Sequence, residues 1–181
     1  MDTTQKLLTL VMDSGAHKAA ALEQSGIITD AGFRKSCEMN TCGAFKRNWH
    51  CPPAIGPIDE LMERVKKYQR GVLYQTVFEI EDSFDIEGMR RAGKLHGELS
   101  RRVHRQLLEG AAGESFLHLA NGGCKICPVC AIITNEPCRY PKEALSPMEG
   151  YGIDVYNTAK NAGLKYINGQ NTVTSFSLIL F

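Results

Sequence analysis

The chain of 181 residues is long enough for one domain with a sizeable hydrophobic core, and its formal net charge is only +1. This balance excludes the strong basic field that attracts nucleic acid, and no apolar stretch approaches the length that spans a membrane. The first residues, MDTTQKLL, carry no apolar signal segment, so we expect a single cytoplasmic domain over residues 1–181 with neither a nucleic-acid nor a membrane partner.

The first half of the chain contains three elements with clear patterns. Apolar spacing predicts a short helix over residues 4–12 and a second helix over residues 58–68, whose first turn is acidic. Residues 71–80 are dense in β-branched and aromatic side chains, which predicts a strand. Residues 16–28 are ambiguous between helix and strand.

The second half predicts one long helix and two strands. Apolar residues recur every three or four positions over residues 85–108, and glycines within 110–113 are expected to end this helix. Residues 115–119 form a short predicted strand, and residues 172–181 form the last one. Alternating helices and strands predict an α/β fold, a single-domain sandwich with a mixed β-sheet flanked by helices and cysteine-rich metal loops at one end.

One further helix is expected near the C-terminus. Ser146 is a candidate N-cap, with Pro147 at the first helical position and Glu149 completing a capping-box pattern. This helix is expected to run to about Ala162, with Gly163 as its C-terminal stop.

Four of the seven cysteines lie in one short stretch. Cys124, Cys127 and Cys130 recur at intervals of three residues, which allows three thiolates of a tight loop to bind different irons of one cubane. Bacterial ferredoxins have the same repeat, followed by a fourth cysteine and a proline. Here the fourth cysteine, Cys138, comes later. The spacing predicts an iron–sulfur ligand loop.

The other three cysteines, Cys37, Cys42 and Cys51, precede a pair of prolines. Their spacing matches no common motif, but the segment lacks apolar periodicity and is rich in turn residues, so it is predicted to be an irregular loop. We expect these three to bind metal as well. The alternative is three buried cysteines that act as small hydrophobic side chains.

Zinc is the alternative metal. A structural zinc ion commonly takes two separate C-x2-C pairs, whereas Cys124, Cys127 and Cys130 form two overlapping pairs, which suit a single tetrahedral ion poorly. Disulfides are disfavoured because seven is an odd number and because clustered cysteines in a cytosolic chain more often bind metal.

These motifs occur together in an order that resembles a known family. The matching features are Cys51-Pro52-Pro53, His96, Gly122-Gly123-Cys124-x2-Cys127-x2-Cys130, Cys138-Arg139-x-Pro141 and residues 146–155. From about Cys37 onward the chain is similar to a cysteine-rich family of small predicted metal-binding proteins of unknown function from anaerobic bacteria and archaea. The resemblance implies bound metal of the iron–sulfur type and implies no reaction.

Seven thiolates are one fewer than two fully ligated 4Fe–4S clusters require. In a first arrangement Cys138 completes the set of Cys124, Cys127 and Cys130; in a second it crosses to Cys37, Cys42 and Cys51. Either leaves one iron open for a substrate or sulfur ligand, unless His50 is an eighth ligand or there is only one cluster.

The sequence therefore predicts a redox-active protein with one or two 4Fe–4S clusters that acts with a redox partner protein or on a small-molecule substrate. A pure electron carrier and a zinc-stabilised binding module are the alternatives. No dinucleotide fingerprint or phosphate-binding loop is present.

Other side chains are candidates to assist the metal. Gly122 and Gly123 are expected to let the backbone approach a cluster, and Arg139 to offset its charge or bind an anion. His96, on the apolar stripe of the long predicted helix, is the candidate proton donor, against the alternative of a core histidine.

Three further side chains have alternative roles. We expect His104 to be solvated. Glu149 and Asp154 are possible acid–base groups, although a capping role is favoured for Glu149.

Overall fold

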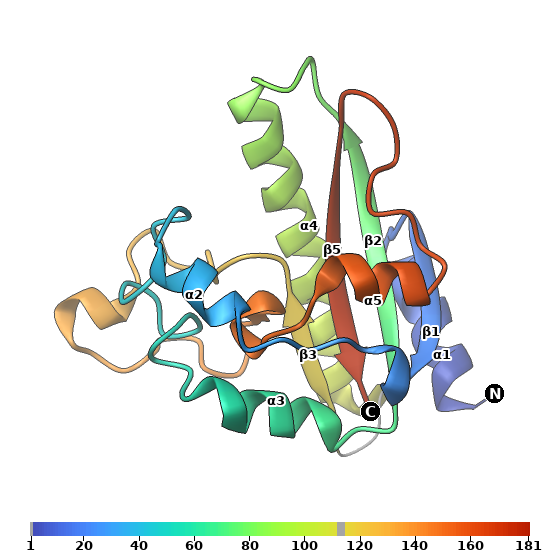
Figure 1. Cartoon of the computed structure of the whole chain (residues 1–181), viewed down its shortest axis with the longest axis horizontal. Helices are drawn as coiled ribbons and strands as arrows, with labels where there is room; N and C mark the ends of the chain where they lie inside the picture. The colour runs from blue at the N-terminus through green and yellow to red at the C-terminus, as the bar shows by residue number, and fades with distance from the viewer. Residues whose placement is uncertain (1, 112–114) are drawn as a thin grey trace.

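The fold is organised around a five-stranded mixed sheet, in a computed structural model that describes residues 2–111 and 115–181 (Figure 1). The strand order is β1-β2-β5-β3-β4. Only β3 and β4 run parallel, and the other neighbours are antiparallel. The strands are β1 (Lys18–Glu23), β2 (Arg70–Glu79), β3 (Leu117–Ala120), β4 (Ser146–Pro147) and β5 (Thr172–Leu180).

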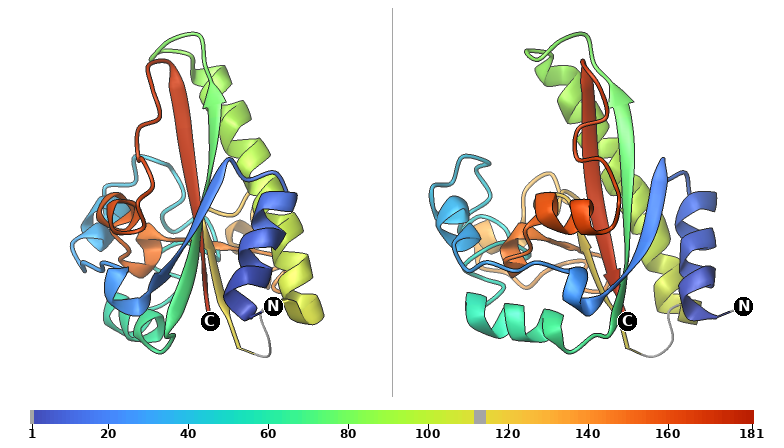
Figure 2. Two further views of the ribbon diagram at one scale, coloured as in Figure 1. Left: turned by 90° about the vertical axis from the view of Figure 1, so that its right-hand side faces the viewer. Right: turned by 45° about the vertical axis from the view of Figure 1, so that its right-hand side comes forward.

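Helices cover both faces of this sheet, which confirms the predicted α/β sandwich (Figure 2). On one face lie α1 (Thr3–Asp13) and α4 (Ile86–Gln106), whose buried residues form one core with β2 and β5. On the other face lie α3 (Ile58–Lys66) and α5 (Val155–Asn161), which form a second core with the same strands. The remaining helix, α2 (Phe33–Glu38), is short and lies beside the second core.

The alternation of side chains along the central strands divides the apolar residues between these cores. In β2, Val72 and Tyr74 pack toward α1 and α4, whereas Leu73 packs toward α3 and α5. Successive side chains of a strand point to opposite faces, so a strand covered on both sides is apolar at almost every position. This explains why residues 71–80 gave the clearest strand signal.

The ambiguous residues 16–28 form strand β1 followed by a single 3-10 turn, Gln24–Gly26. These residues form a strand and not a helix because β1 pairs antiparallel with β2, with Ala20 opposite Leu73. The long predicted helix is confirmed as α4, which continues into a short π-helical turn, Leu107–Ala111, in which Gly110 has a non-helical φ of +100°. Gly113, the other expected stop, lies outside the described residues.

The helix start predicted at Ser146 is wrong. Ser146 and Pro147 pair instead with Leu119 and Ala120 as strand β4. Helix α5 begins only at Val155, after a 3-10 turn (Glu149–Tyr151) and Gly152 at a φ of +74°, and its N-cap is Asp154. Pairing with β3 therefore determines the structure of this segment despite the local capping pattern. The predicted end of the helix at Gly163 is confirmed, and this glycine has a φ of +70°.

Both cysteine segments lie at the β3–β4 edge of the sheet, away from β1 and α1 (Figure 1). Residues 121–145 leave the end of β3 and return to the neighbouring β4, so the two ends of this loop are anchored side by side. Cys37 belongs to the last turn of α2, and the chain from there to α3 consists of turns and bends. No helix of the described ranges has both the length and the apolar character needed to cross a bilayer.

Candidate metal centre

The cysteines of the second group face one small pocket. Cys124, Cys127, Cys130 and Cys138 all line a cavity of about 20 Å³, together with His50. Each of the four thiols is half-buried and free. The loop that carries them contains one turn of 3-10 helix, Ala131–Thr134, between Cys130 and Cys138. The backbone therefore brings a cysteine distant in sequence back beside the three closely spaced ones.

The cysteines of the first group lie next to this pocket. Cys51 is only 4% exposed, and burial raises the pKa of its thiol to about 12, with further contributions from the thiols of Cys42 and Cys37 and smaller ones from Cys124 and Cys130. Burial also raises the pKa of Cys37. All seven cysteines thus lie at one end of the molecule, as predicted from their loops.

Two side chains between Cys42 and Cys51 fasten the cysteine segments to each other. The buried amide of Asn48 donates from Nδ2 to the carbonyl of Cys124 at 2.7 Å and accepts from the backbone N–H of His50 at 2.9 Å. The indole of Trp49 donates to the carbonyl of Glu136 at 2.9 Å. Sequence reasoning missed both residues, since neither is a ligand type and their partners are distant in the chain.

Gly122 and Gly123 each occupy a position that favours glycine. Gly122 has a φ of +64°, in the left-handed region. A Cβ on Gly123 would lie 2.9 Å from the sulfur of Cys51 and 3.3 Å from Nδ2 of Asn48. The absence of a side chain at Gly123 therefore allows the first cysteine segment to pack directly against the second.

Two polar side chains border the four-cysteine pocket. His50 places Nε2 at 3.8 Å from the sulfur of Cys138 and Nδ1 at 3.4 Å from the hydroxyl of Ser146, and burial lowers the pKa of its ring. Its neutral imidazole is the form that binds metals. Arg139 is exposed and donates to the carbonyl of Val129 at 3.2 Å and to the carboxylate of Glu136 at 3.2 Å. It thus braces the loop between Cys130 and Cys138.

His96 lies elsewhere, in the layer between α4 and the sheet. It is 1% exposed, and its ring nitrogens lie 2.8 Å from the hydroxyls of Thr76 and Ser177. Burial lowers its pKa to about 4. Among the described residues, it lines none of the three cavities that cysteines border. Its catalytic role stays a prediction, and these contacts are those of a core histidine.

The same layer overturns the expectation that His104 is solvated. His104 is 8% exposed, with Nε2 at 2.9 Å from the carbonyl of Lys142 and Nδ1 at 3.3 Å from Nδ1 of His118. Of the two candidate acid–base carboxylates, Asp154 is the N-cap of α5 and accepts from the backbone N–H of Asn157 at 3.0 Å. Glu149 is half-buried, and burial raises its pKa.

A second, wider cavity of about 660 Å³ is bordered by Cys42 as well as Cys124, Cys127 and Cys130. Cysteines therefore border both a small cavity and a wide one. Within residues 2–111 and 115–181, no group of three or more His, Cys, Asp or Glu side chains is arranged to hold a single metal ion. The fit to a metal thus rests on the donor set, seven free thiols with an adjacent imidazole, which is of the soft type that iron–sulfur clusters and zinc accept.

Fold and donor set together define an α/β protein with a candidate thiolate metal centre at the edge of its sheet. The chain belongs to the family described as predicted metal-binding protein (DUF2284), whose model matches residues 20–181. This match includes all seven cysteines and confirms the part of the resemblance that concerns a predicted metal-binding family of unknown function. No curated protein and no solved structure matches the chain.

Proposed function

We propose that the protein is an iron–sulfur protein in which Cys124, Cys127, Cys130 and Cys138 hold one 4Fe–4S cluster. The observation that carries this proposal is that these four thiols border one pocket. Besides burial, the neighbours that raise the pKa of Cys124 are Cys138, Cys127 and Cys130. This grouping supports the arrangement in which Cys138 completes its own loop.

A cluster suits this placement of the thiols better than one zinc ion does. The four ligands of a zinc ion converge on a single point, at about 2.3 Å from the metal. The thiolates of a 4Fe–4S cluster each bind a different iron, so they must enclose a larger volume. The wider cavity of about 660 Å³, which Cys124, Cys127 and Cys130 also border, lies next to the small four-cysteine pocket and offers such a volume.

Cys37, Cys42 and Cys51 are the proposed ligands of a second cluster. Cys51 lies close enough to Cys42 and Cys37 for their charges to raise its pKa. Three thiolates leave one iron without a protein thiolate, where a substrate or sulfur ligand would bind. Such a centre supplies electron transfer and a Lewis acid when bound. We thus propose a cytoplasmic, redox-active protein that exchanges electrons with a partner protein.

The position of His50 supports a second candidate function, an electron carrier in which every iron of both clusters has a protein ligand. Its neutral imidazole lies 3.8 Å from the sulfur of Cys138, and His50 immediately precedes Cys51 in the first cysteine segment, so it is the side chain best placed to act as an eighth ligand. This form would show two reversible redox couples and no spectral response to added small ligands.

A series of Cys→Ser variants tests the assignment of ligands. The triple variant Cys37→Ser, Cys42→Ser, Cys51→Ser should retain about four of the eight irons of two 4Fe–4S clusters. Adding Cys138→Ser should then remove the remaining cluster or alter its spectrum. If the fourth replacement changed nothing, Cys138 would serve the first segment instead. If the triple variant kept all the iron of the native protein, the second cluster would be disproved.

A further inference from the structure

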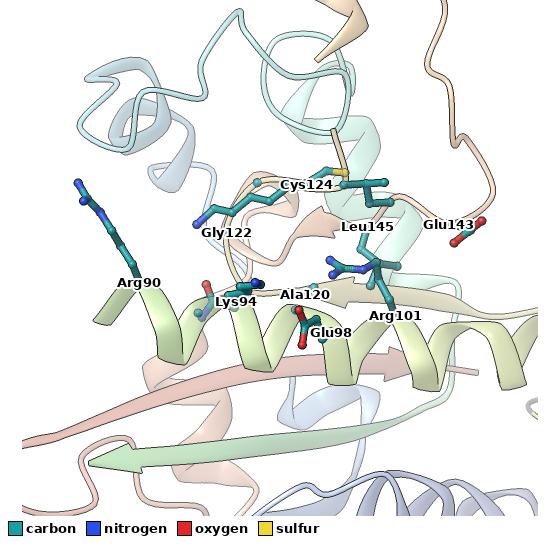
Figure 3. A pocket seen from close by; sticks show the side chains of 15 residues that line it. Arg90, Lys94, Glu98, Arg101, Ala120, Gly122, Cys124, Glu143 and Leu145 are labelled. Carbon is teal, nitrogen blue, oxygen red and sulfur yellow. The ribbon is translucent and has the colours of Figure 1, made fainter. Parts of the chain in front are cut away.

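A cavity of about 460 Å³ lies between helix α4 and the first residues of the second cysteine loop (Figure 3). The loop residues 121–125 line this cavity and also the wider cysteine-bordered cavity, so they form a wall between the two. On the α4 side, the lining residues follow one stripe at spacings of three and four: Arg90, Gly93, Lys94, Gly97, Glu98 and Arg101. Cys124 lies on the opposite side of the pocket (Figure 3).

The charge of this pocket is predominantly positive. Four of its lining side chains are basic, namely Arg90, Lys94, Arg101 and Lys125, whereas two are acidic, Glu98 and Glu143. Glu143 is already engaged by Arg105, whose Nε lies 3.7 Å from its carboxylate. In the part of the chain that the structure describes, none of the four basic side chains forms an ion pair. This local excess contrasts with the near-neutral chain as a whole.

Two glycines keep the floor of the pocket open. Gly93 and Gly97 lie one turn apart inside α4, where glycine is destabilising relative to alanine. A Cβ on Gly93 would meet no atom within 4 Å, and one on Gly97 would lie 3.5 Å from Nη1 of Arg101. Packing within the chain therefore does not require glycine at either position. A side chain added at Gly93 would occupy the pocket.

We propose that this pocket binds a small organic anion that carries a carboxylate or phosphate group. The guanidinium forks of Arg90 and Arg101 suit both groups, and the ammonium groups of Lys94 and Lys125 add charge without imposing a direction. The volume is within the range of about 300–1,000 Å³ typical of small-molecule sites. Ala120, Ile126 and Leu145 supply an apolar wall for the carbon part of the ligand.

The concave shape favours a small molecule over an acidic protein surface, which would need a broad, flat patch of charge. The inference goes beyond the proposed function, because it depends on α4 and the loop wall and not on which metal the thiols hold. It does place the anion beside Cys124, on the side of the loop away from Cys42.

The test is calorimetric titration of the full-length protein, as purified with its metal, with succinate and with inorganic phosphate at constant ionic strength. We expect at least one of the two probes to bind, and the tighter probe identifies the anionic group. The double variant Arg90→Gln, Arg101→Gln should weaken this binding at least tenfold. Arg91→Gln, which removes one positive charge from the same helix outside the pocket, is the control and should bind like the native protein.

A second variant, Gly93→Leu, fills the pocket without removing charge and uses a residue that favours helix. It should abolish binding while circular dichroism and metal content stay native. Failure of both probes to bind, or equal weakening in Arg91→Gln, would overturn the proposal, and an acidic protein surface would then be the better partner. Metal content is measured for every variant, so loss of anion binding at native metal content is separate from any failure of the metal assignment.

Discussion

At Gly123 the two cysteine segments lie so close together that no side chain fits between them. A methyl group there would lie 2.9 Å from the sulfur of Cys51, nearer than carbon and sulfur can approach. We therefore expect Gly123→Ala to lower the free energy of unfolding by about 1–3 kcal/mol, as overpacking typically does. Because Cys51 must shift, the variant should also bind less metal per chain. Urea unfolding and metal analysis measure the two effects.

Gly26→Ala is the matched control for this substitution. A Cβ at Gly26 would make ordinary contacts, the closest at 3.5 Å from Leu22, far from the cysteines. Its stability and metal content should stay near native. Equal behaviour of the two variants would show that the close approach at Gly123 does not hold the cysteine segments together.

The residue scale also shows what could and could not be predicted from the sequence. The cysteines were visible because a spacing of three residues is a local property of the chain. Asn48 was not, because its role depends on meeting the carbonyl of Cys124 across the fold. His50 was noted only as a possible extra ligand, and its distance of 3.8 Å from the sulfur of Cys138 is a tertiary fact.

At the scale of elements, helix α4 encloses a layer of buried polar groups against the sheet. His96 and His104 of α4 and His118 of β3 lie in this layer, where the phenol of Tyr74 lies 2.9 Å from His118 Nε2 and the hydroxyl of Ser100 lies 2.9 Å from that of Ser177. Burial lowers the pKa of all three rings, that of His96 to about 4. The three imidazoles are therefore neutral in the folded protein at neutral pH.

This layer predicts a loss of stability in acid. Below a pH of about 6.5 the unfolded chain binds protons that the folded chain does not, so the free energy of unfolding falls as the pH falls toward 4. His96 alone should contribute a loss of about 2 kcal/mol between pH 7 and pH 5. In urea titrations at these pH values, His96→Gln should show a smaller pH dependence than the native protein.

The exposed His17 supplies the control for that experiment. The variant His17→Gln makes the same substitution at an exposed position, so it shows how much of any change comes from the substitution itself. If His96→Gln kept the full pH dependence, His96 would not be the buried neutral group that the fold indicates.

The elements also divide into those that sequence patterns predict and those that they do not. The long amphipathic α4 and the two-sided apolar strands β2 and β5 were predicted nearly to their ends, because many residues contribute to each pattern. The start of α5 was placed at Ser146 from a capping pattern of three residues. That segment pairs with β3 instead, a partner that no local pattern could reveal.

For the whole molecule, the sheet supplies a stable frame and its β3–β4 edge carries the two cysteine segments. Two cores on opposite faces fix the strands. The second cysteine loop starts and ends at adjacent strands, and the first packs against it through Asn48 and Gly123. A soft metal centre at this edge would join segments that are distant in the sequence, so metal binding and stability should be linked.

The most direct test of the metal centre is the content of iron, acid-labile sulfide and zinc per chain in protein purified without oxygen, with a visible spectrum of the same sample. We predict about eight iron and eight sulfide, the content of two 4Fe–4S clusters. About four of each would show that there is only one cluster, and Cys37, Cys42 and Cys51 would then be structural residues. A colourless protein that contains zinc and no iron would contradict the iron–sulfur proposal.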